Sequence, residues 1–181
     1  MWVSGSGKTT VLNASWIVDT PTFLYVQSYT TRPLREWEVN GEKYHHIDKE
    51  VFQQGIQAWE FLERATVHQD YLYGTKYLDL VWPLEKGVNT IKEIDMYGLL
   101  DIIKQWKIDW LYTTIFLDVP EEVMLERIRW RGDVSDEEVK KRIESSKFER
   151  EQAKIHCDYI IDASQPLEKV VEEFTRIIWV N

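Results

Sequence analysis

Short apolar runs alternate with longer helical patterns along the chain, and this alternation restricts the fold more than any other feature of the sequence. The strand-like runs occupy residues 22–27, 88–94, 112–119 and 159–161. The helical patterns occupy residues 8–18, 96–106, 121–130, 137–156 and 167–179. Strands that alternate with helices are typical of an α/β fold with a largely parallel sheet. The sequence therefore predicts an α/β fold in which helices flank a parallel-sheet core.

Residues 29–75 interrupt this alternation. Proline, glycine, aromatic and charged residues are mixed there, and one short helical pattern near 48–57 has strand-like pieces around it. No linker rich in proline, serine or glycine separates independent domains, and no repeat is visible. We therefore expect one core, made of residues 1–28 and 76–181, that carries residues 29–75 as an inserted lobe.

Charge and cysteine content exclude several functional classes. The chain has 181 residues, 22 of them basic and 31 acidic, so its formal net charge is −9, which disfavours nucleic acid and anionic membranes as partners. Cys157 is the only cysteine, so neither an intrachain disulfide nor a thiolate metal cage can form. No targeting segment is visible, and no apolar run approaches the roughly 18 residues of a membrane span. We expect a cytoplasmic protein.

A glycine-rich segment opens the first helical pattern and carries a phosphate-binding signature. It comprises Gly5, Ser6, Gly7, Lys8, Thr9 and Thr10. A turn of this kind aims backbone N–H groups and the helix dipole at phosphate oxygens. In a Walker A loop the lysine holds the β- and γ-phosphates and the next hydroxyl ligates Mg²⁺, which predicts these roles for Lys8 and Thr9. The alternative is a glycine-rich helix start with a solvated lysine.

The start of this loop departs from the full pattern. Trp2 stands where the Walker A pattern has its first glycine, and only Met1, Trp2 and Val3 precede the loop. A loop of this type follows a β-strand, whose usual length is about 5 to 6 residues. We expect about six to ten further apolar-rich residues before Met1 in the native protein.

An ordered series of further motifs extends along the chain. It consists of Ser28-Tyr29-Thr30-Thr31-Arg32-Pro33-Leu34-Arg35, Glu38-Val39-Asn40-Gly41-Glu42-Lys43-Tyr44, Phe61-Leu62-Glu63, Tyr73-Gly74-Thr75 and Glu93-Ile94-Asp95-Met96-Tyr97-Gly98. Together with the glycine-rich loop, this series resembles guanylate kinase. The resemblance implies a P-loop core, a small GMP-binding lobe at 29–75, a lid at about 119–156, and the reaction of ATP with GMP to give ADP and GDP.

The resemblance assigns the GMP site residue by residue. A dianionic phosphate calls for guanidinium groups and hydroxyl donors, and the family's phosphate ligands match Arg32, Arg35, Tyr44 and Tyr73. Guanine presents N1–H and the N2 amino group side by side, so one carboxylate accepts both hydrogen bonds, and Glu63 matches that position. The remaining guanine contacts match Ser28, Thr75 and Asp95.

Phosphoryl transfer requires cations that neutralise charge on the transferred group. Arg127 and Arg131 lie four residues apart on one helical pattern, and Arg142 lies on the next. They match the family's lid arginines, so together with Lys8 they are the expected catalytic residues. Without the resemblance, an arginine pair on a glutamate-rich helix is typical of a solvated face.

Two other functions remain open at this stage. The chain could be a protein-binding module that resembles guanylate kinase but is catalytically weak, or a kinase of another small phosphorylated metabolite. The retained Lys8, Thr9 and lid arginines favour the enzyme, and Glu63, Thr75 and Asp95 favour GMP as its acceptor. Lys92 departs from the family pattern, because that strand position is usually apolar, and Asp162 stands where asparagine is usual. No chemistry is assigned to the histidines.

Overall fold

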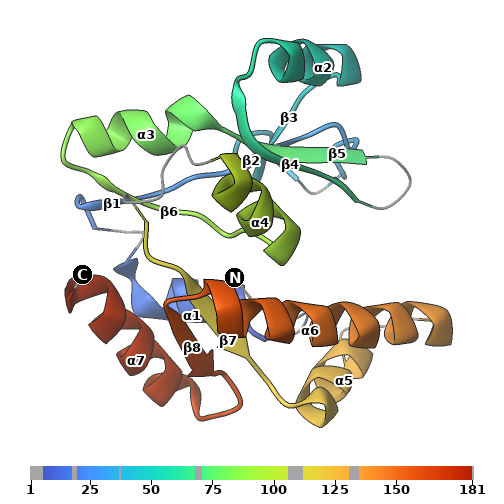
Figure 1. The fold of residues 1–181 in the computed structure, drawn as a ribbon, viewed down its shortest axis with the longest axis vertical. Helices are drawn as coiled ribbons and strands as arrows, with labels where there is room; N and C mark the ends of the chain where they lie inside the picture. The colour runs from blue at the N-terminus through green and yellow to red at the C-terminus, as the bar shows by residue number, and fades with distance from the viewer. Residues whose placement is uncertain are drawn as a thin grey trace. The chain divides into compact units, whose positions relative to one another are not determined.

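The computed structural model describes residues 6–17, 20–36, 38–67, 71–105, 112–130 and 135–180 (Figure 1). The chain divides into two compact units. One unit is Asp19–Asp109, and the other combines Met1–Val18 with Trp110–Asn181. The predicted lobe, residues 29–75, lies within the first of these, and its boundaries stay a prediction.

Seven helices and eight strands are present in the part of the chain that the structure describes. The helices are α1 (Lys8–Ser15), α2 (Lys49–Gln57), α3 (Tyr77–Glu85), α4 (Met96–Gln105), α5 (Glu121–Trp130), α6 (Asp136–His156) and α7 (Leu167–Val180). The strands are β1 (Phe23–Tyr25), β2 (Ser28–Thr30), β3 (Tyr44–His46), β4 (Phe61–Val67), β5 (Tyr71–Lys76), β6 (Asn89–Ile91), β7 (Ile115–Asp118) and β8 (Tyr159–Asp162).

In the unit that contains the chain ends, β7 and β8 pair in parallel, from Ile115 opposite Tyr159 to Asp118 opposite Asp162. Apolar side chains from this pair and from the neighbouring helices form the core; among them are Phe116, Leu117, Val119, Met124, Ile128 and Ile161. Helix α1 packs against α7. The pair is reinforced at its start, where Thr114 Oγ1 donates to Asp158 Oδ2 at 2.7 Å and accepts from the Asp158 N–H at 2.8 Å.

Helix α6 is attached to the carboxyl end of β7. Arg150, on α6, donates from Nε to Asp118 Oδ1 at 2.7 Å and from Nη2 to the Val119 carbonyl. Among the described side chains of α6, those of two small residues, Ser146 and Ala153, are buried. A side chain without bulk at these positions lets the helix lie close to its neighbours.

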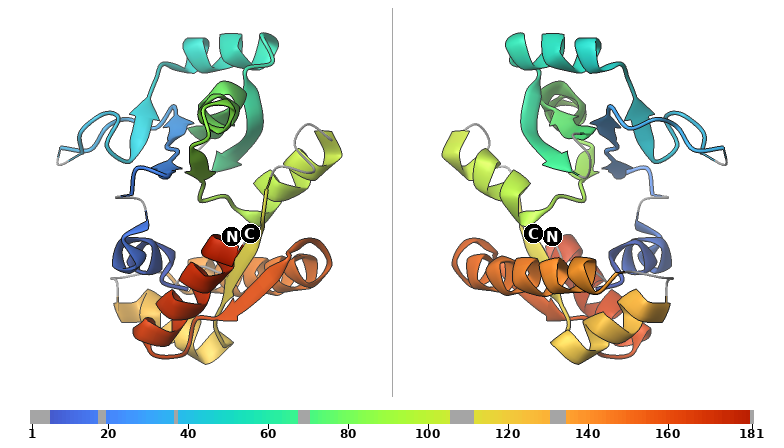
Figure 2. Two further views of the ribbon diagram at one scale, coloured as in Figure 1. Left: turned by 90° about the vertical axis from the view of Figure 1, so that its left-hand side faces the viewer. Right: turned by 90° about the vertical axis from the view of Figure 1, so that its right-hand side faces the viewer.

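The other unit is built on a four-stranded sheet in the order β3-β2-β5-β4 (Figure 2). Strands β2 and β3 are parallel, whereas β5 is antiparallel to both β2 and β4. The rings of Phe52 on α2 and Phe61 on β4 stack with their centroids 4.2 Å apart, and Leu62 is fully buried. This packing holds α2 against the sheet.

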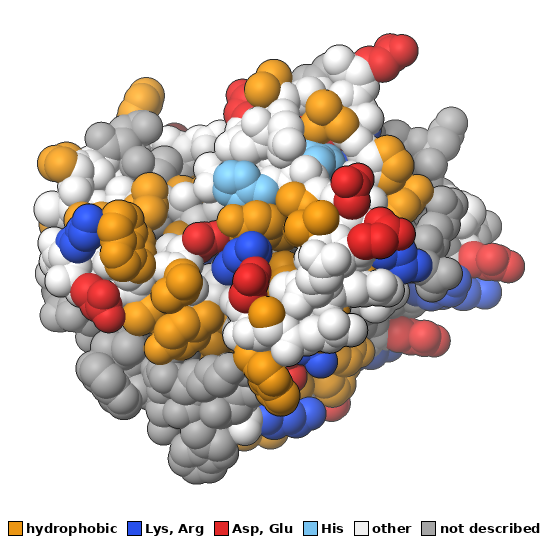
Figure 3. All heavy atoms as spheres, turned by 90° about the horizontal axis from the view of Figure 1, so that it is seen from above, with side chains coloured by type: hydrophobic (Ala, Val, Ile, Leu, Met, Phe, Trp, Pro, Cys, Tyr) orange, Lys and Arg blue, Asp and Glu red, His pale blue; other side chains and the backbone are white. Residues whose placement is uncertain are grey.

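The same unit holds a second parallel pair, β1 with β6, from Phe23 opposite Asn89 to Tyr25 opposite Ile91. Helix α4 packs against β4, and its buried side chains Met96, Leu99 and Ile102 have a three-residue spacing that places them on one helix face. On the molecular face drawn in Figure 3, hydrophobic side chains are interspersed with acidic, basic and histidine side chains. None of the described helices is both long and apolar enough to cross a membrane.

The predicted α/β class with parallel strands is confirmed, and both units contain parallel strands: β7 pairs with β8 in one, and β1 pairs with β6 and β2 with β3 in the other. Helices α4 to α7 begin within a residue of their predicted starts, whereas α1 ends three residues before its predicted end. Helix α3 was not predicted. Its sequence is apolar on most sides, so it lacks the polar face of an amphipathic helix. It also contains Pro83, a residue that usually ends a helix.

Candidate functional site

The glycine-rich loop ends at the amino end of α1, where Gly7 is the N-cap residue. Gly7 has φ 87°, a left-handed conformation that glycine adopts without strain. No side chain caps the helix, and no acidic residue lies in its first turn. The first N–H groups of α1 are therefore suited to an external anion.

Ser6 and the threonines surround this helix start. The Ser6 side chain is buried, and its Oγ has no hydrogen-bond partner among the residues that the structure describes. Lys8 is partly buried, whereas Thr9 and Thr10 are exposed. A buried hydroxyl without a partner is costly, so Ser6 is consistent with a site whose remaining partner is a ligand. Gly5 lies outside the described residues.

Arg127 is the predicted catalytic arginine that the structure places against this loop. From α5 its guanidinium donates to the Ser6 carbonyl at 3.3 Å and to the Ala163 carbonyl at 3.1 Å. Its Nη1 lies 3.8 Å from where a Cβ on Gly7 would stand. Arg142 is partly buried on α6, and Arg131 falls outside the described residues.

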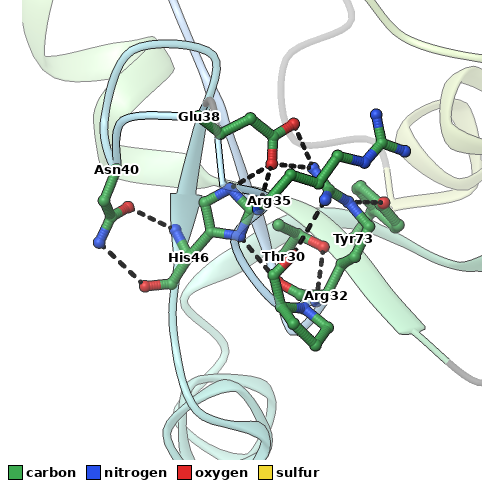
Figure 4. Close-up of polar contacts among 8 residues, drawn as sticks. Thr30, Arg32, Arg35, Glu38, Asn40, His46 and Tyr73 are labelled. Atoms are coloured by element: carbon green, nitrogen blue, oxygen red, sulfur yellow. Dashed lines mark hydrogen bonds and ion pairs between the residues drawn. The ribbon is translucent and has the colours of Figure 1, made fainter.

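A basic and phenolic cluster forms in the other unit, at the edge of its four-stranded sheet (Figure 4). Arg32 donates from Nε to the Tyr73 hydroxyl at 3.2 Å. Its guanidinium carbon lies 5.8 Å from the centroid of the Tyr44 ring, and the Tyr44 and Tyr73 rings meet edge to face at 5.7 Å. Burial raises the pKa of Tyr44, so this hydroxyl stays a hydrogen-bond donor.

Glu38 holds this cluster together, and sequence reasoning missed it. Arg32 Nη2 donates to both carboxylate oxygens of Glu38, at 2.7 and 2.9 Å, and the Arg35 N–H donates to Oε2 at 3.0 Å. The hydrogen bond from Arg32 lowers the pKa of Glu38 to about 2. The Arg35 side chain itself is exposed. The carboxylate thus occupies the Nη2 donors of Arg32.

His46 is the second residue of the cluster that sequence reasoning passed over. Its Nδ1 lies 2.7 Å from the Arg32 carbonyl, and its Nε2 lies 3.8 Å from Glu38 Oε2. Asn40 brackets the His46 backbone, accepting from its N–H at 2.7 Å (Figure 4). The available signal was the alternation along β3, which sends adjacent histidines to opposite faces: His45 lies against Tyr29, and His46 lies against the Arg32 segment.

A buried carboxylate lies further along the same sheet. Glu63 is 7% exposed, and the Thr75 hydroxyl donates to its Oε1 at 2.5 Å. Helix α4 approaches it because residue 98 is glycine: a Cβ there would stand 2.7 Å from Ile94 Cγ1 and 3.1 Å from Glu63 Oε2. Asp95 precedes α4 and accepts from the Gly98 N–H at 2.7 Å.

Charges around Glu63 act in both directions. Burial raises the pKa of Glu63, and Asp95 and Asp101 add to this effect by repulsion. The hydrogen bond from Thr75 and the positive charge of Lys92 lower the pKa. Lys92 also donates to Ser28 Oγ at 2.5 Å, which brings the predicted guanine contact Ser28 into the same group.

These arrangements suit two chemically distinct ligands. In one unit, an uncapped helix start with a lysine and an arginine suits phosphate oxygens. In the other, a guanidinium with two phenols suits a second phosphate, and a buried carboxylate with hydroxyl neighbours suits a base that offers adjacent N–H donors. The predicted residues Arg32, Tyr44 and Tyr73 come together, as do Ser28, Glu63, Thr75 and Asp95.

Known proteins share both the sequence and the fold. The family model for guanylate kinase matches residues 3–181. A guanylate kinase of Aliivibrio fischeri is 36% identical over 149 residues, 81% of this chain and 70% of the relative. One of Desulfotalea psychrophila is 32% identical over 179 residues, 98% of this chain and 85% of the relative. The crystal structure of guanylate kinase from Anaplasma phagocytophilum has the same fold, with a TM-score of 0.72 at 24% identity, over 99% of this chain and 82% of that one. By the extent of the family match and the identity to these relatives, the chain belongs to the guanylate kinase family.

Proposed function

We infer that this chain transfers the γ-phosphoryl group of ATP to GMP and so produces ADP and GDP. The single observation that best supports GMP as the acceptor is the buried Glu63 carboxylate, held by Thr75 on the sheet that also carries the Arg32 cluster. A base and a phosphate that belong to one nucleotide can be held by one sheet in this way.

On the GMP side, we assign the phosphate to Arg32, Arg35, Tyr44 and Tyr73. Glu63 accepts hydrogen bonds from N1–H and the N2 amino group, and Ser28, Thr75 and Asp95 complete the contacts to guanine. Because adenine offers no N–H at position 1, it would leave the buried carboxylate without a partner, and this rejects AMP. The phosphate replaces Glu38 as the acceptor for Arg32.

On the ATP side, we assign the phosphates to the loop of Gly5, Ser6, Gly7, Lys8, Thr9 and Thr10. Mg²⁺ fits here, because the exposed Thr9 hydroxyl lies at the uncapped start of α1, and the ion supplies positive charge that neutralises the β- and γ-phosphates. Lys8 binds the same oxygens as a point charge. The Ser6 hydroxyl gains a partner when phosphate is bound.

Transfer depends on holding the donor and acceptor phosphates in line while charge on the transferred group is neutralised. We assign this neutralisation to Lys8, Arg127, Arg131 and Arg142. Arg127 is already oriented by two backbone carbonyls, so it loses little rotamer freedom on binding. We propose residues 29–75 as the GMP-binding lobe and about 119–156 as the lid; a bisubstrate analogue should increase amide-exchange protection in both.

ATP and GMP are the proposed small-molecule partners, and we propose a cytoplasmic location, which the single cysteine supports. A coupled assay of ADP release with ATP and each of GMP, AMP, CMP and UMP tests the reaction. We expect release with GMP to exceed that with the other three by far.

Two variants separate the sites. Lys8→Ala should suppress turnover and leave GMP affinity intact, whereas Glu63→Ala should weaken GMP binding, measured by isothermal titration. Lys169→Ala, an exposed change on α7, is the control. Normal GMP binding without any ADP release would instead support the protein-binding module, and equal loss of GMP affinity in both variants would refute the division between the sites.

A further inference from the structure

Lys92 directly follows β6, and its ammonium group reaches the link between β1 and β2. Nζ donates to the Val26 carbonyl at 3.0 Å and to Ser28 Oγ at 2.5 Å. The side chain is partly buried.

The contact determines how the Ser28 hydroxyl can be used. An ammonium group has three donors and no acceptor, so Ser28 Oγ must accept from Lys92. The hydroxyl hydrogen of Ser28 is then left to be donated elsewhere. A charged donor on the oxygen also polarises the O–H bond and strengthens the outgoing hydrogen bond.

Guanine and adenine differ at position 6, where guanine has a carbonyl oxygen that accepts and adenine has an amino group that donates. We propose that Lys92 is a specificity-determining residue of the GMP site: through Ser28 it presents a donor to the base, and its charge favours a base with a carbonyl at position 6 over one with an amino group. This inference rests on the proposed function and on the placement of Ser28 at the base.

The same charge also acts on the other recognition group. Among the described residues, the charged groups that act on Glu63 are Lys92, Asp95 and Asp101; the two aspartates raise the pKa of Glu63 in addition to burial, and Lys92 lowers it. Glu63 must be ionised to accept two hydrogen bonds from guanine. Lys92 therefore supports a donor at Ser28 and an acceptor at Glu63 at once.

The test is isothermal titration of GMP and of AMP, without ATP, into the wild type and Lys92→Met. Loss of a charge-assisted hydrogen bond predicts that the Kd for GMP rises about tenfold and that the ratio of the AMP and GMP constants falls by a similar factor. Lys49→Met, an exposed change at the start of α2, should leave both constants unchanged. Thermal melts establish that each variant is folded.

Two readouts exclude a merely structural effect. If Lys92 acts through Ser28, then at a pH where Glu63 is ionised in every variant, adding Lys92→Met to Ser28→Ala should raise the GMP constant by less than about twofold, because the contact is already absent. As the pH is lowered, GMP affinity should fall at a higher pH in Lys92→Met than in the wild type. Lys92→Arg, which keeps the positive charge, should restore the wild-type pH dependence of GMP affinity. The second ionisation of the GMP phosphate, near pH 6, is common to all variants and cancels in the comparison.

Each outcome bears on a separate statement. A wild type that fails to bind GMP would refute the proposed function. If the wild type binds GMP and Lys92→Met has the same GMP affinity, selectivity and pH dependence, only the role of Lys92 is refuted. Fully additive effects of Lys92→Met and Ser28→Ala on GMP affinity would refute that role as well. If Lys92→Met does not fold, Ser28→Ala decides, because an unchanged ratio of the AMP and GMP constants in that variant would also overturn the proposal.

Discussion

Replacing Glu63 with glutamine should weaken GMP binding and stabilise the ligand-free protein. The amide has the shape of the carboxylate, and its oxygen can still accept from the Thr75 hydroxyl, now 2.5 Å from Oε1. Its NH₂ group, however, meets a donor of guanine. Two charge-assisted hydrogen bonds of about 1.5 to 3 kcal/mol each are replaced by one neutral bond of about 1 kcal/mol. The net loss of about 3 kcal/mol corresponds to about a hundredfold in Kd.

The stabilisation arises because Glu63 is 7% exposed and faces Asp95 and Asp101. Ionising a buried carboxyl costs several kcal/mol, which Thr75 and Lys92 offset only in part. We expect a net gain of about 1 kcal/mol near neutral pH, or about 2 to 4 °C in Tm.

The sign of the pH dependence follows from the raised pKa of Glu63. The folded protein keeps this proton to a higher pH than the unfolded chain, so wild-type stability falls as pH rises from the ordinary value of 4.5 through the raised one. The difference in Tm between Glu63→Gln and the wild type should open over that window and be small below about pH 4.

Titration calorimetry with GMP and thermal melts from pH 4 to 8 measure both effects. Glu42→Gln, an exposed change in the same unit, is the matched control. An unchanged GMP affinity of Glu63→Gln would refute the base contact. A lower Tm of this variant at neutral pH would refute the destabilising effect of the buried charge.

Three further outcomes are expected. Gly7→Ala places a side chain at φ 87°, which costs about 1 to 2 kcal/mol and should lower Tm and raise the KM for ATP with GMP affinity unchanged; an unaltered melt would contradict the strain. Thr114→Val removes the two hydrogen bonds to Asp158 and should lower urea stability by about 1 to 3 kcal/mol without changing GMP affinity, so equal midpoints would refute their contribution. The stabilisation from the pair of Glu38 with Arg32 is fully present above the ordinary pKa of 4.5 and is lost as pH falls through about 2. In Glu38→Gln, the loss of stability with falling pH, followed by circular dichroism, should therefore be less steep between these pH values.

The sequence predicts the members of the site better than their contacts. Arg32 and Tyr73 are 41 residues apart and were grouped only because an ordered series of motifs resembles a family; the antiparallel pairing of β2 with β5, which sets Thr30 opposite Tyr73, is what brings their side chains together. Similarly, Arg127 contacts the carbonyl of Ser6 across 121 residues, a distance that no local pattern encodes.

Glu38 was missed for a physical reason. An acidic residue that follows two arginines has the appearance of a solvated surface charge, and its role depends on the fold of 32–46 around it. His46 was missed because its partner is a backbone carbonyl, that of Arg32, which carries no signature in sequence. The sequence indicated Lys92 only as a charged residue at a position expected to be apolar. The hydrogen bond from Lys92 to Ser28 Oγ, which the structure shows, is what suggests a function for it.

A rotation of α6 about the ion pair between Arg150 and Asp118 would move each residue of the helix in proportion to its distance from that pair. The 21-residue helix is about 32 Å long, and it is fastened to β7 near its carboxyl-terminal third, with Arg142 two turns, or about 12 Å, nearer the amino end. A rotation of about 10° about that attachment displaces Arg142 by about 2 Å, comparable with the difference between a direct hydrogen bond and one bridged by water. If Arg142 binds a phosphate as proposed, a small rotation about the Arg150–Asp118 contact is therefore enough to change a direct hydrogen bond into one bridged by water.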